Sequence, residues 1–238
     1  MNTELIDVAG TAETRLTPEI LAQLPDQPAP APWRGAASMI TWWSRLDGAR
    51  AARVTDLLPT ALRAARPLAT VGALVSYIET PVGRYDEIIA GVLLRQGRAV
   101  FAHVPFIAVD SPASLVSGRA NWALPKTLAT FTGRPANQET MTAAAGDWQV
   151  SATTRTRGPA LPVLLPAVAG LVQAGPDGRR WSVRLGMGRG RAQLARVTVE
   201  VTAPGELAAL LTPGHHIGTL LPHLTLSLPT STVSGTAT

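Results

Sequence analysis

Three apolar segments joined by turn-like connections constrain the fold of this chain more than any other feature. Residues 71–77, 87–94 and 99–109 are rich in β-branched, leucine and aromatic side chains. The connections at 81–84 and 95–98 are short and contain glycine, with a proline in the first, as turns do. Strands joined by short turns pair antiparallel. This region therefore predicts a run of antiparallel strands.

Further strands are predicted on both sides of this region. The segment 38–43 ends in Trp42-Trp43, which on a strand places one ring on each face, one for the core and one for a subunit contact. Valines 197, 199 and 201 alternate with polar residues, as in a half-buried strand. The other predicted strands span 127–131, 140–144, 148–154, 181–185, 192–201 and 220–228. Many short strands predict a mostly-β fold, either a barrel or a sandwich.

Helices are predicted to be few and short. Thr17-Pro18 pairs an N-cap residue with a proline at the first helical position, and Asp110-Ser111-Pro112 opens a second helix over 112–121. Residues 47–58 have helical composition, and 205–211 can form one more turn. We expect an N-terminal helix and a Pro/Ala linker over 1–33, one main domain over 34–228, and a flexible tail over 229–238.

Composition excludes several classes of function. The chain has no cysteine, so disulfides, thiolate metal sites and cysteine nucleophiles are excluded. The net charge of +5 comes from scattered arginines and predicts no nucleic-acid interface. The N-terminus lacks the pattern of a signal peptide, and the most apolar window, 160–172, is interrupted by Pro162 and Pro166. We therefore expect a cytoplasmic protein that does not bind membranes.

Lys126 is the only lysine in 238 residues, whereas the other 20 basic residues are arginines. An arginine stays protonated and cannot act as an amine nucleophile, whereas a lysine can lose its proton when it is buried. Lys126 follows a proline and has apolar neighbours, including Trp122, Leu124 and Leu128. This context favours a partly buried amine, although a surface lysine left by chance is the simpler alternative.

The motifs around Lys126 resemble those of the acetoacetate decarboxylase family. They comprise Gly83-Arg84-Tyr85-Asp86-Glu87, an apolar strand that ends at Asp110, the pair Gly118-Arg119, and the segment Trp122-Ala123-Leu124-Pro125-Lys126. The resemblance is good over residues 71–131 and diffuse elsewhere. It implies a closed antiparallel β-barrel or cone with the site inside its mouth, and a homo-oligomeric assembly.

The resemblance also implies the chemistry. Lys126 corresponds to the lysine that forms a Schiff base with a keto acid or a related carbonyl compound, and Glu87 to the carboxylate that moves protons beside it. An amine attacks a ketone only when it is neutral, and the iminium then withdraws electrons from the bond that breaks. No cofactor or metal is needed for this chemistry. Without the resemblance, an exposed Glu87 or one paired with Arg84 is the simpler interpretation.

Other residues are candidates for binding the substrate. Trp122, Leu124 and Tyr85 are expected to be pocket walls, with the Tyr85 hydroxyl as a hydrogen-bond donor, although each also suits a simple core position. Arg119 is a candidate for binding an anionic group, although an arginine there more often pairs locally. Arg34 is nearest to the place of the arginine that the family directs at a substrate carboxylate, but it precedes the predicted strand.

The sequence departs from the family pattern at three further places. Thr127 stands where the decarboxylases carry a second lysine, and Ala120 replaces a glutamate. A second active-site glutamate is expected near 71–73, where the chain has no carboxylate. The chain therefore keeps the lysine machinery but lacks parts that recognise a β-keto carboxylate. The leading hypothesis is a β-keto acid decarboxylase. An aldolase-dehydratase with the same lysine, and a barrel that binds a small ligand without catalysis, are the alternatives.

Two weaker motifs have simpler explanations. The glycine-rich run 186–191 lacks the ending of a phosphate-binding loop, which favours a turn between strands. His215, His216 and His223 suggest a metal site, but adjacent residues on a strand point to opposite faces and no carboxylate cluster accompanies them. We therefore predict no metal site.

Overall fold

The fold is described from a computed structural model, in which residues 7–165, 170–184, 186 and 188–235 are placed. Residues 66–109 form the predicted antiparallel strands β2 (Arg66–Glu79), β3 (Tyr85–Gln96) and β4 (Ala99–Val109). The turns between them contain Gly83 and Gly97, both at positive φ, where glycine carries no steric cost. The prediction for this region is confirmed.

Most other predicted elements are also present. The helices are α1 (Pro18–Leu21), α2 (Gly48–Asp56), α3 (Pro112–Trp122) and α4 (Leu207–Leu210). The remaining strands are β1 (Trp33–Arg45), β5 (Lys126–Leu128), β6 (Thr130–Thr132), β7 (Thr140–Ala145), β8 (Trp148–Leu165), β9 (Gly170–Ala174), β10 (Arg180–Arg184), β11 (Gly188–Thr202), β12 (Gly214–Leu228) and β13 (Thr232–Ser234). The chain is therefore mostly β, as predicted, and none of the described helices has the length and apolarity needed to cross a bilayer.

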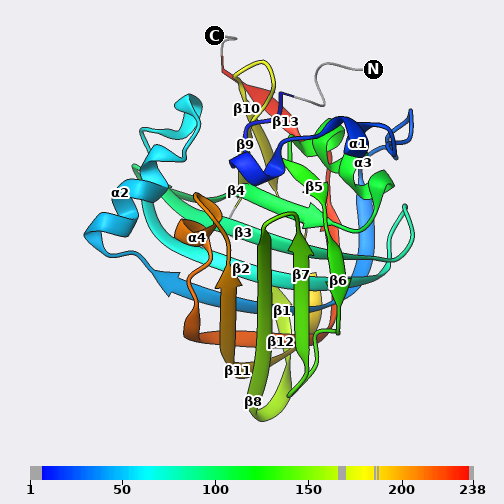
Figure 1. The fold of residues 1–238 in the computed structure, drawn as a ribbon, viewed down its shortest axis with the longest axis vertical. Coiled ribbons are helices and arrows are strands. Elements are labelled where there is room, and N and C mark those ends of the chain that lie inside the picture. Colours follow the sequence, from blue (N-terminus) through cyan, green and yellow to red (C-terminus); the bar gives the residue numbers. More distant parts are fainter. Residues whose placement is uncertain (1–6, 166–169, 185, 187, 236–238) are drawn as a thin grey trace.

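Within the described residues the strands form one 13-stranded sheet that curves around the main core (Figure 1). Its order is β13-β10-β9-β4-β3-β2-β1-β12-β11-β8-β7-β6, and β5 pairs separately with β4. The main core includes Trp42, Phe106 and Met141, from β1, β4 and β7. Trp42 is 1% exposed and Trp43 is 46% exposed, which confirms that the two rings occupy opposite faces.

The closed barrel that the resemblance implied is not found, because the hydrogen-bonded sheet is open. One continuous segment explains this. Its first part, β5, pairs with the end of β4, and its second part, β6, pairs with β7 on the far side of the sheet. Ala129 separates the two parts, and its N–H donates to the carbonyl of Val109. A single chain segment therefore spans the gap between β4 and β7 without a continuous ladder.

Two local predictions also differ from the structure. We expected a turn at 186–191, but β11 begins at Gly188, and Arg189–Arg191 pair with both β8 and β12; residues 185 and 187 lie outside the described part. We expected a flexible tail from residue 229, but Thr232–Ser234 form β13 and pair with β10. The edge of β10 offers unpaired backbone groups, and the tail satisfies them.

Candidate active site

A tight turn after α3 places Lys126. Ala123 ends the helix in the left-handed conformation (φ 50°), and the N–H groups of Ala123 and Leu124 donate to the carbonyls of Arg119 and Gly118. The chain then enters β5, where Lys126 pairs in parallel register with Ile107 of β4. From this position the lysine side chain runs back along α3 and passes Gly118.

The amine of Lys126 is buried among polar partners. Its Nζ donates to Glu87 Oε2 at 2.6 Å and to Ser114 Oγ at 2.9 Å, and it lies 5.2 Å from the centre of the Tyr85 ring. Lys126 is 3% exposed and Glu87 is 2% exposed. The structure thus brings together the two residues for which we predicted catalytic roles, and it excludes a lysine left on the surface.

Strand β3 places Glu87 by simple alternation. Side chains of a strand point alternately to its two faces. Ile88 and Ala90 enter the main core, whereas Tyr85, Glu87 and Ile89 face the cavity beside Lys126. The motif that contains Tyr85 and Glu87 therefore has a geometric basis.

Tyr77 of β2 is the second partner of Glu87. Its hydroxyl donates to Glu87 Oε1 at 3.0 Å, and its ring stacks on that of Tyr85 with the centres 4.4 Å apart. Burial, and secondly the charge of Glu87, raise the pKa of both phenols well above the ordinary value. Both hydroxyls therefore keep their protons, and Tyr77 is a permanent hydrogen-bond donor to the carboxylate.

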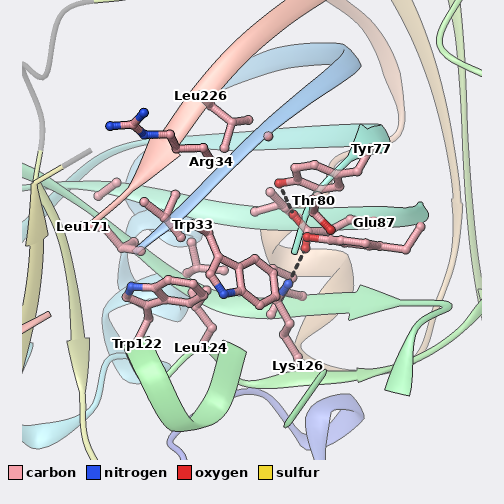
Figure 2. A pocket seen from close by; sticks show the side chains of 17 residues that line it. Trp33, Arg34, Tyr77, Thr80, Glu87, Trp122, Leu124, Lys126, Leu171 and Leu226 are labelled. Carbon is pink, nitrogen blue, oxygen red and sulfur yellow. Dashed lines mark hydrogen bonds and ion pairs between the residues drawn. The ribbon is translucent and has the colours of Figure 1, made fainter. Parts of the chain in front are cut away.

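Lys126 and Glu87 lie at one end of a cavity of about 210 Å³. Figure 2 shows their ion pair, with Trp33, Trp122 and Leu124 along the walls. The lining is largely apolar and comes from β1, β2, β3, β4, β5, β9, β12, the end of α3 with the turn after it, and the connection between β2 and β3. It comprises Trp33, Arg34, Gly35, Tyr77, Thr80, Tyr85, Glu87, Ile89, Ala102, Val104, Ile107, Trp122, Leu124, Lys126, Leu171, Leu226 and Leu228. A buried amine, a carboxylate and an apolar chamber suit an organic carbonyl compound.

Trp122, Leu124 and Tyr85 line this cavity, where we expected pocket walls. Trp122 packs edge-to-face on Trp33, with the ring centres 5.2 Å apart, and its indole N–H donates to the carbonyl of Pro229 at 2.8 Å. Tyr85 lies beneath the Lys126 amine. Direct contact of these residues with a substrate stays a prediction.

Arg119, the candidate for binding an anionic group, lies outside the cavity lining and pairs locally, which was the alternative that the sequence favoured. Its guanidinium is buried and donates to the carbonyl of Lys126 at 2.7 Å and to that of Thr14 at 2.6 Å. Burial lowers the pKa of Arg119 to about 10, which leaves it charged at neutral pH. Helix α3 directs this side chain toward the backbone of β5, so Arg119 fixes the position of Lys126.

Arg34 lies at the rim of the cavity. It belongs to β1, which begins at Trp33, so the sequence-based expectation that it precedes the strand is wrong. The residue is exposed, and its guanidinium points away from the Lys126–Glu87 pair in Figure 2. Arg34 therefore lines the cavity without placing its guanidinium beside the Lys126 amine.

The sequence did not identify Ser114, Tyr77 or Trp33 as site residues. Ser114 lies one helical turn before Gly118, and its spacing to Gly118 was an available signal. Tyr77 lies opposite Tyr85 in the β2–β3 register, which the sequence alone does not reveal. The second carboxylate expected near 71–73 is absent, and the buried residues on the same face of β2 as Tyr77 are Ala73 and Val75.

The described residues contain no group of three or more His, Asp or Glu side chains placed to hold a metal ion. His215 and His216 have separate partners. Thr198 Oγ1 lies 3.0 Å from His215 Nδ1, and Ser44 Oγ lies 3.1 Å from His216 Nδ1.

Comparison with known families matches residues 12–165 to the acetoacetate decarboxylase (ADC) family. A search of curated proteins found no match. Among solved structures, an acetoacetate decarboxylase superposes with a TM-score of 0.69 at 13% identity, covering 92% of this chain and 98% of the other.

Two further solved structures share the fold. An acetoacetate decarboxylase-like enzyme from Sphingomonas wittichii RW1 has a TM-score of 0.65 at 18% identity, covering 96% of this chain and 100% of the other. The enduracididine biosynthesis enzyme MppR, complexed with pyruvate, has a TM-score of 0.66 at 13% identity, covering 86% of this chain and 91% of the other. At these identities the likeness concerns the fold.

Proposed function

Because the chain belongs to the acetoacetate decarboxylase family, we propose that it is a cofactor-independent lyase in which Lys126 forms a Schiff base with a keto acid. One observation carries this proposal. The amine of the single lysine is buried at the end of a cavity, 2.6 Å from the carboxylate of Glu87. A buried lysine paired with one carboxylate and facing open volume is suited to nucleophilic catalysis.

Glu87 and Lys126 share the proton steps in this mechanism. Transfer of a proton from Nζ to Glu87 Oε2 leaves a neutral amine, whose lone pair attacks the carbonyl carbon. Glu87 then returns the proton to the alkoxide oxygen, takes a proton from the nitrogen of the carbinolamine and delivers it to the hydroxyl, which leaves as water and gives the iminium. Tyr77 continues to donate to Oε1, and Ser114 keeps Nζ in place.

The reaction that we favour is decarboxylation of a β-keto acid. The bond between the α-carbon and the carboxylate breaks, carbon dioxide leaves, and the electron pair moves onto the iminium nitrogen to give an enamine. Glu87, protonated again from water after the dehydration step, supplies a proton to the α-carbon, and water hydrolyses the resulting iminium to release the ketone and the Lys126 ammonium. The iminium accepts the electron pair, so no other electron acceptor is required.

An aldolase-dehydratase is the second candidate. The specific observation in its favour is the direction of Arg34, because the cavity contains no other cation except Lys126 among its described lining residues. The arginine that the family directs at the carboxylate of a β-keto acid is therefore not beside the amine, so one feature expected of a decarboxylase is missing. The structural neighbour MppR has been solved in complex with the condensation product of pyruvate and imidazole 4-carboxaldehyde, which supports this candidate.

The two reactions are separated by their products. Fresh β-keto acids are supplied to one sample, and pyruvate with an aldehyde to another, and carbon dioxide and condensation products are measured. A decarboxylase releases carbon dioxide faster than the spontaneous reaction, and Lys126→Arg abolishes the increase. Condensation without carbon dioxide release would instead support the aldolase-dehydratase. Activity that survives in Lys126→Arg would contradict both, and a cavity that only binds a ligand would give neither product.

The predicted homo-oligomeric assembly and cytoplasmic location stay predictions. The exposed ring of Trp43 on the outer face of β1 is compatible with a subunit contact.

A further inference from the structure

We propose that the site accepts β-keto acids whose carbonyl carries an unbranched apolar chain longer than the methyl group of acetoacetate. This inference rests on the proposed Schiff-base function. It concerns the part of the cavity that extends away from Lys126, which a substrate of the size of acetoacetate leaves unfilled.

The length of the cavity follows from the strand that lines it. At one end, Ile107 of β4 pairs with Lys126; at the other end, Ala102 of β4 pairs with Leu171 of β9. All four residues line the cavity. Five steps along an extended strand at about 3.3 Å each correspond to roughly 16 Å, and the extra residue of a bulge between these positions shortens the span by about one step. The apolar space therefore runs beside β4 for much more than the length of acetoacetate.

An irregularity in β4 makes this long wall continuous. The register with β3 shifts between the pairs Ala90–Phe106 and Val92–His103. Such a bulge changes which face a side chain occupies. As a result Ala102, Val104 and Ile107 all line the cavity, although strict alternation would turn Ile107 away.

The far walls offer almost no polar partners. Val104, Leu124, Leu171 and Leu226 present hydrocarbon to the cavity. The two indoles do the same, because their N–H groups are already bonded elsewhere, that of Trp33 to the carbonyl of Ala29 and that of Trp122 to the carbonyl of Pro229. A charged or polar chain in this space would lose its hydration without compensation, whereas an alkyl chain would gain from burial.

The test compares β-keto acids of increasing chain length with the wild-type protein. Burial of each added methylene group strengthens binding roughly fourfold. We therefore expect kcat/KM for carbon dioxide release to rise from acetoacetate through 3-oxohexanoate to 3-oxooctanoate, by at least about tenfold overall. Equal values, or a preference for acetoacetate, would overturn this inference and leave the proposed function in place.

Variants at the far end of the cavity test where the alkyl chain of the substrate binds. Ala102→Phe fills the space beside Leu171, and it should lower kcat/KM for 3-oxooctanoate by at least about tenfold more than it lowers kcat/KM for acetoacetate, so that the chain-length preference is lost. The matched control is Ala99→Phe on the same strand, since Ala99 is exposed and outside the cavity lining. Ala102→Leu is a smaller change in case the phenylalanine variant does not fold.

The outcomes separate the two proposals. If the preference for 3-oxooctanoate survives in both Ala102 variants, the alkyl chain of the substrate binds elsewhere and this inference is wrong. If no β-keto acid of any length is decarboxylated and borohydride traps no adduct, the proposed function fails, and this inference fails with it.

Discussion

Gly118 on α3 lies against the side chain of Lys126. A Cβ atom at this glycine would lie 2.5 Å from Cδ and 2.7 Å from Cε of the lysine. The backbone of α3 therefore provides the surface along which the lysine side chain runs toward Glu87. This contact gives a physical reason for a glycine immediately before Arg119.

Replacement of Gly118 by alanine should displace the lysine side chain. A shift of about 1 Å in a reacting group lowers rates by roughly a hundredfold, so we expect a decrease of that order in the rate of Schiff-base formation. The rate is followed by borohydride trapping at successive times. The control is Gly48→Ala at the start of α2, where an added Cβ meets no atom within 4 Å. Equal trapping rates in the two variants would contradict this role of Gly118.

Removal of the Tyr77 hydroxyl by a phenylalanine substitution should impair the proton steps. Glu87 would lose a hydrogen bond of 3.0 Å, and a bond to a charged group is worth about 1.5–3 kcal/mol. We expect kcat to fall about tenfold or more with little change in KM, because Tyr77 contacts the carboxylate rather than the substrate carbonyl. An unchanged kcat, with a correctly folded protein, would show that this bond has no part in the reaction.

Arg119 acts through the backbone of Lys126, so its substitution should affect the position of the Lys126 side chain as well as the stability of the fold. In Arg119→Met the buried carbonyls of Lys126 and Thr14 lose their donors, and we expect the free energy of unfolding to fall by about 3 kcal/mol. The trapping rate should fall as well. Arg119→Lys should restore part of the free energy of unfolding and part of the trapping rate, since an ammonium reaches one of the two carbonyls. Lower stability with an unchanged trapping rate would contradict the positioning role.

His103 makes the stability of the fold depend on pH. Burial lowers its pKa from 6.5 to about 4, while its Nδ1 lies 3.1 Å from the carbonyl of Val172. Well above pH 6.5 the imidazole ring is neutral in both the folded and the unfolded chain. As the pH falls from 6.5 to about 4, the unfolded chain binds a proton that the folded chain does not, so stability decreases. The difference between 6.5 and about 4 corresponds to about 3 kcal/mol.

Urea unfolding between pH 7 and pH 4 measures this contribution. The variant His103→Gln keeps a donor for Val172 but cannot take up a proton. Its free energy of unfolding should therefore decrease between pH 7 and pH 4 by about 3 kcal/mol less than that of the wild type. Carboxylates that titrate in the same range act equally in both proteins. Identical pH dependence would show that His103 does not cause the effect.

The parts of the site that could be predicted from the sequence are those that depend on local pattern. Alternation along β3 places Tyr85 and Glu87 on one face, and the Ser-Pro start predicts the helix that delivers Lys126. These features need only neighbouring residues. The resemblance supplied the pairing of Lys126 with Glu87, which are 39 positions apart.

The parts that could not be predicted depend on distant pairing. Tyr77 contributes because β2 and β3 pair in one particular register, and Leu171 because β9 lies parallel to β4. The open sheet depends on the exchange of partners at Ala129. For Arg119 the sequence favoured local pairing, but its partners on Lys126 and Thr14 become visible only when the chain is folded.

The central claim is that the Lys126 amine forms a covalent bond with a carbonyl substrate. Intact-mass measurement after incubation with β-keto acids and borohydride tests it most directly, because the chain offers no other lysine. We predict one adduct on the wild-type protein, mapped to Lys126 by peptide analysis, and none on Lys126→Arg. An adduct of the same yield on Lys126→Arg, or none on the wild type with any keto acid, would contradict the account.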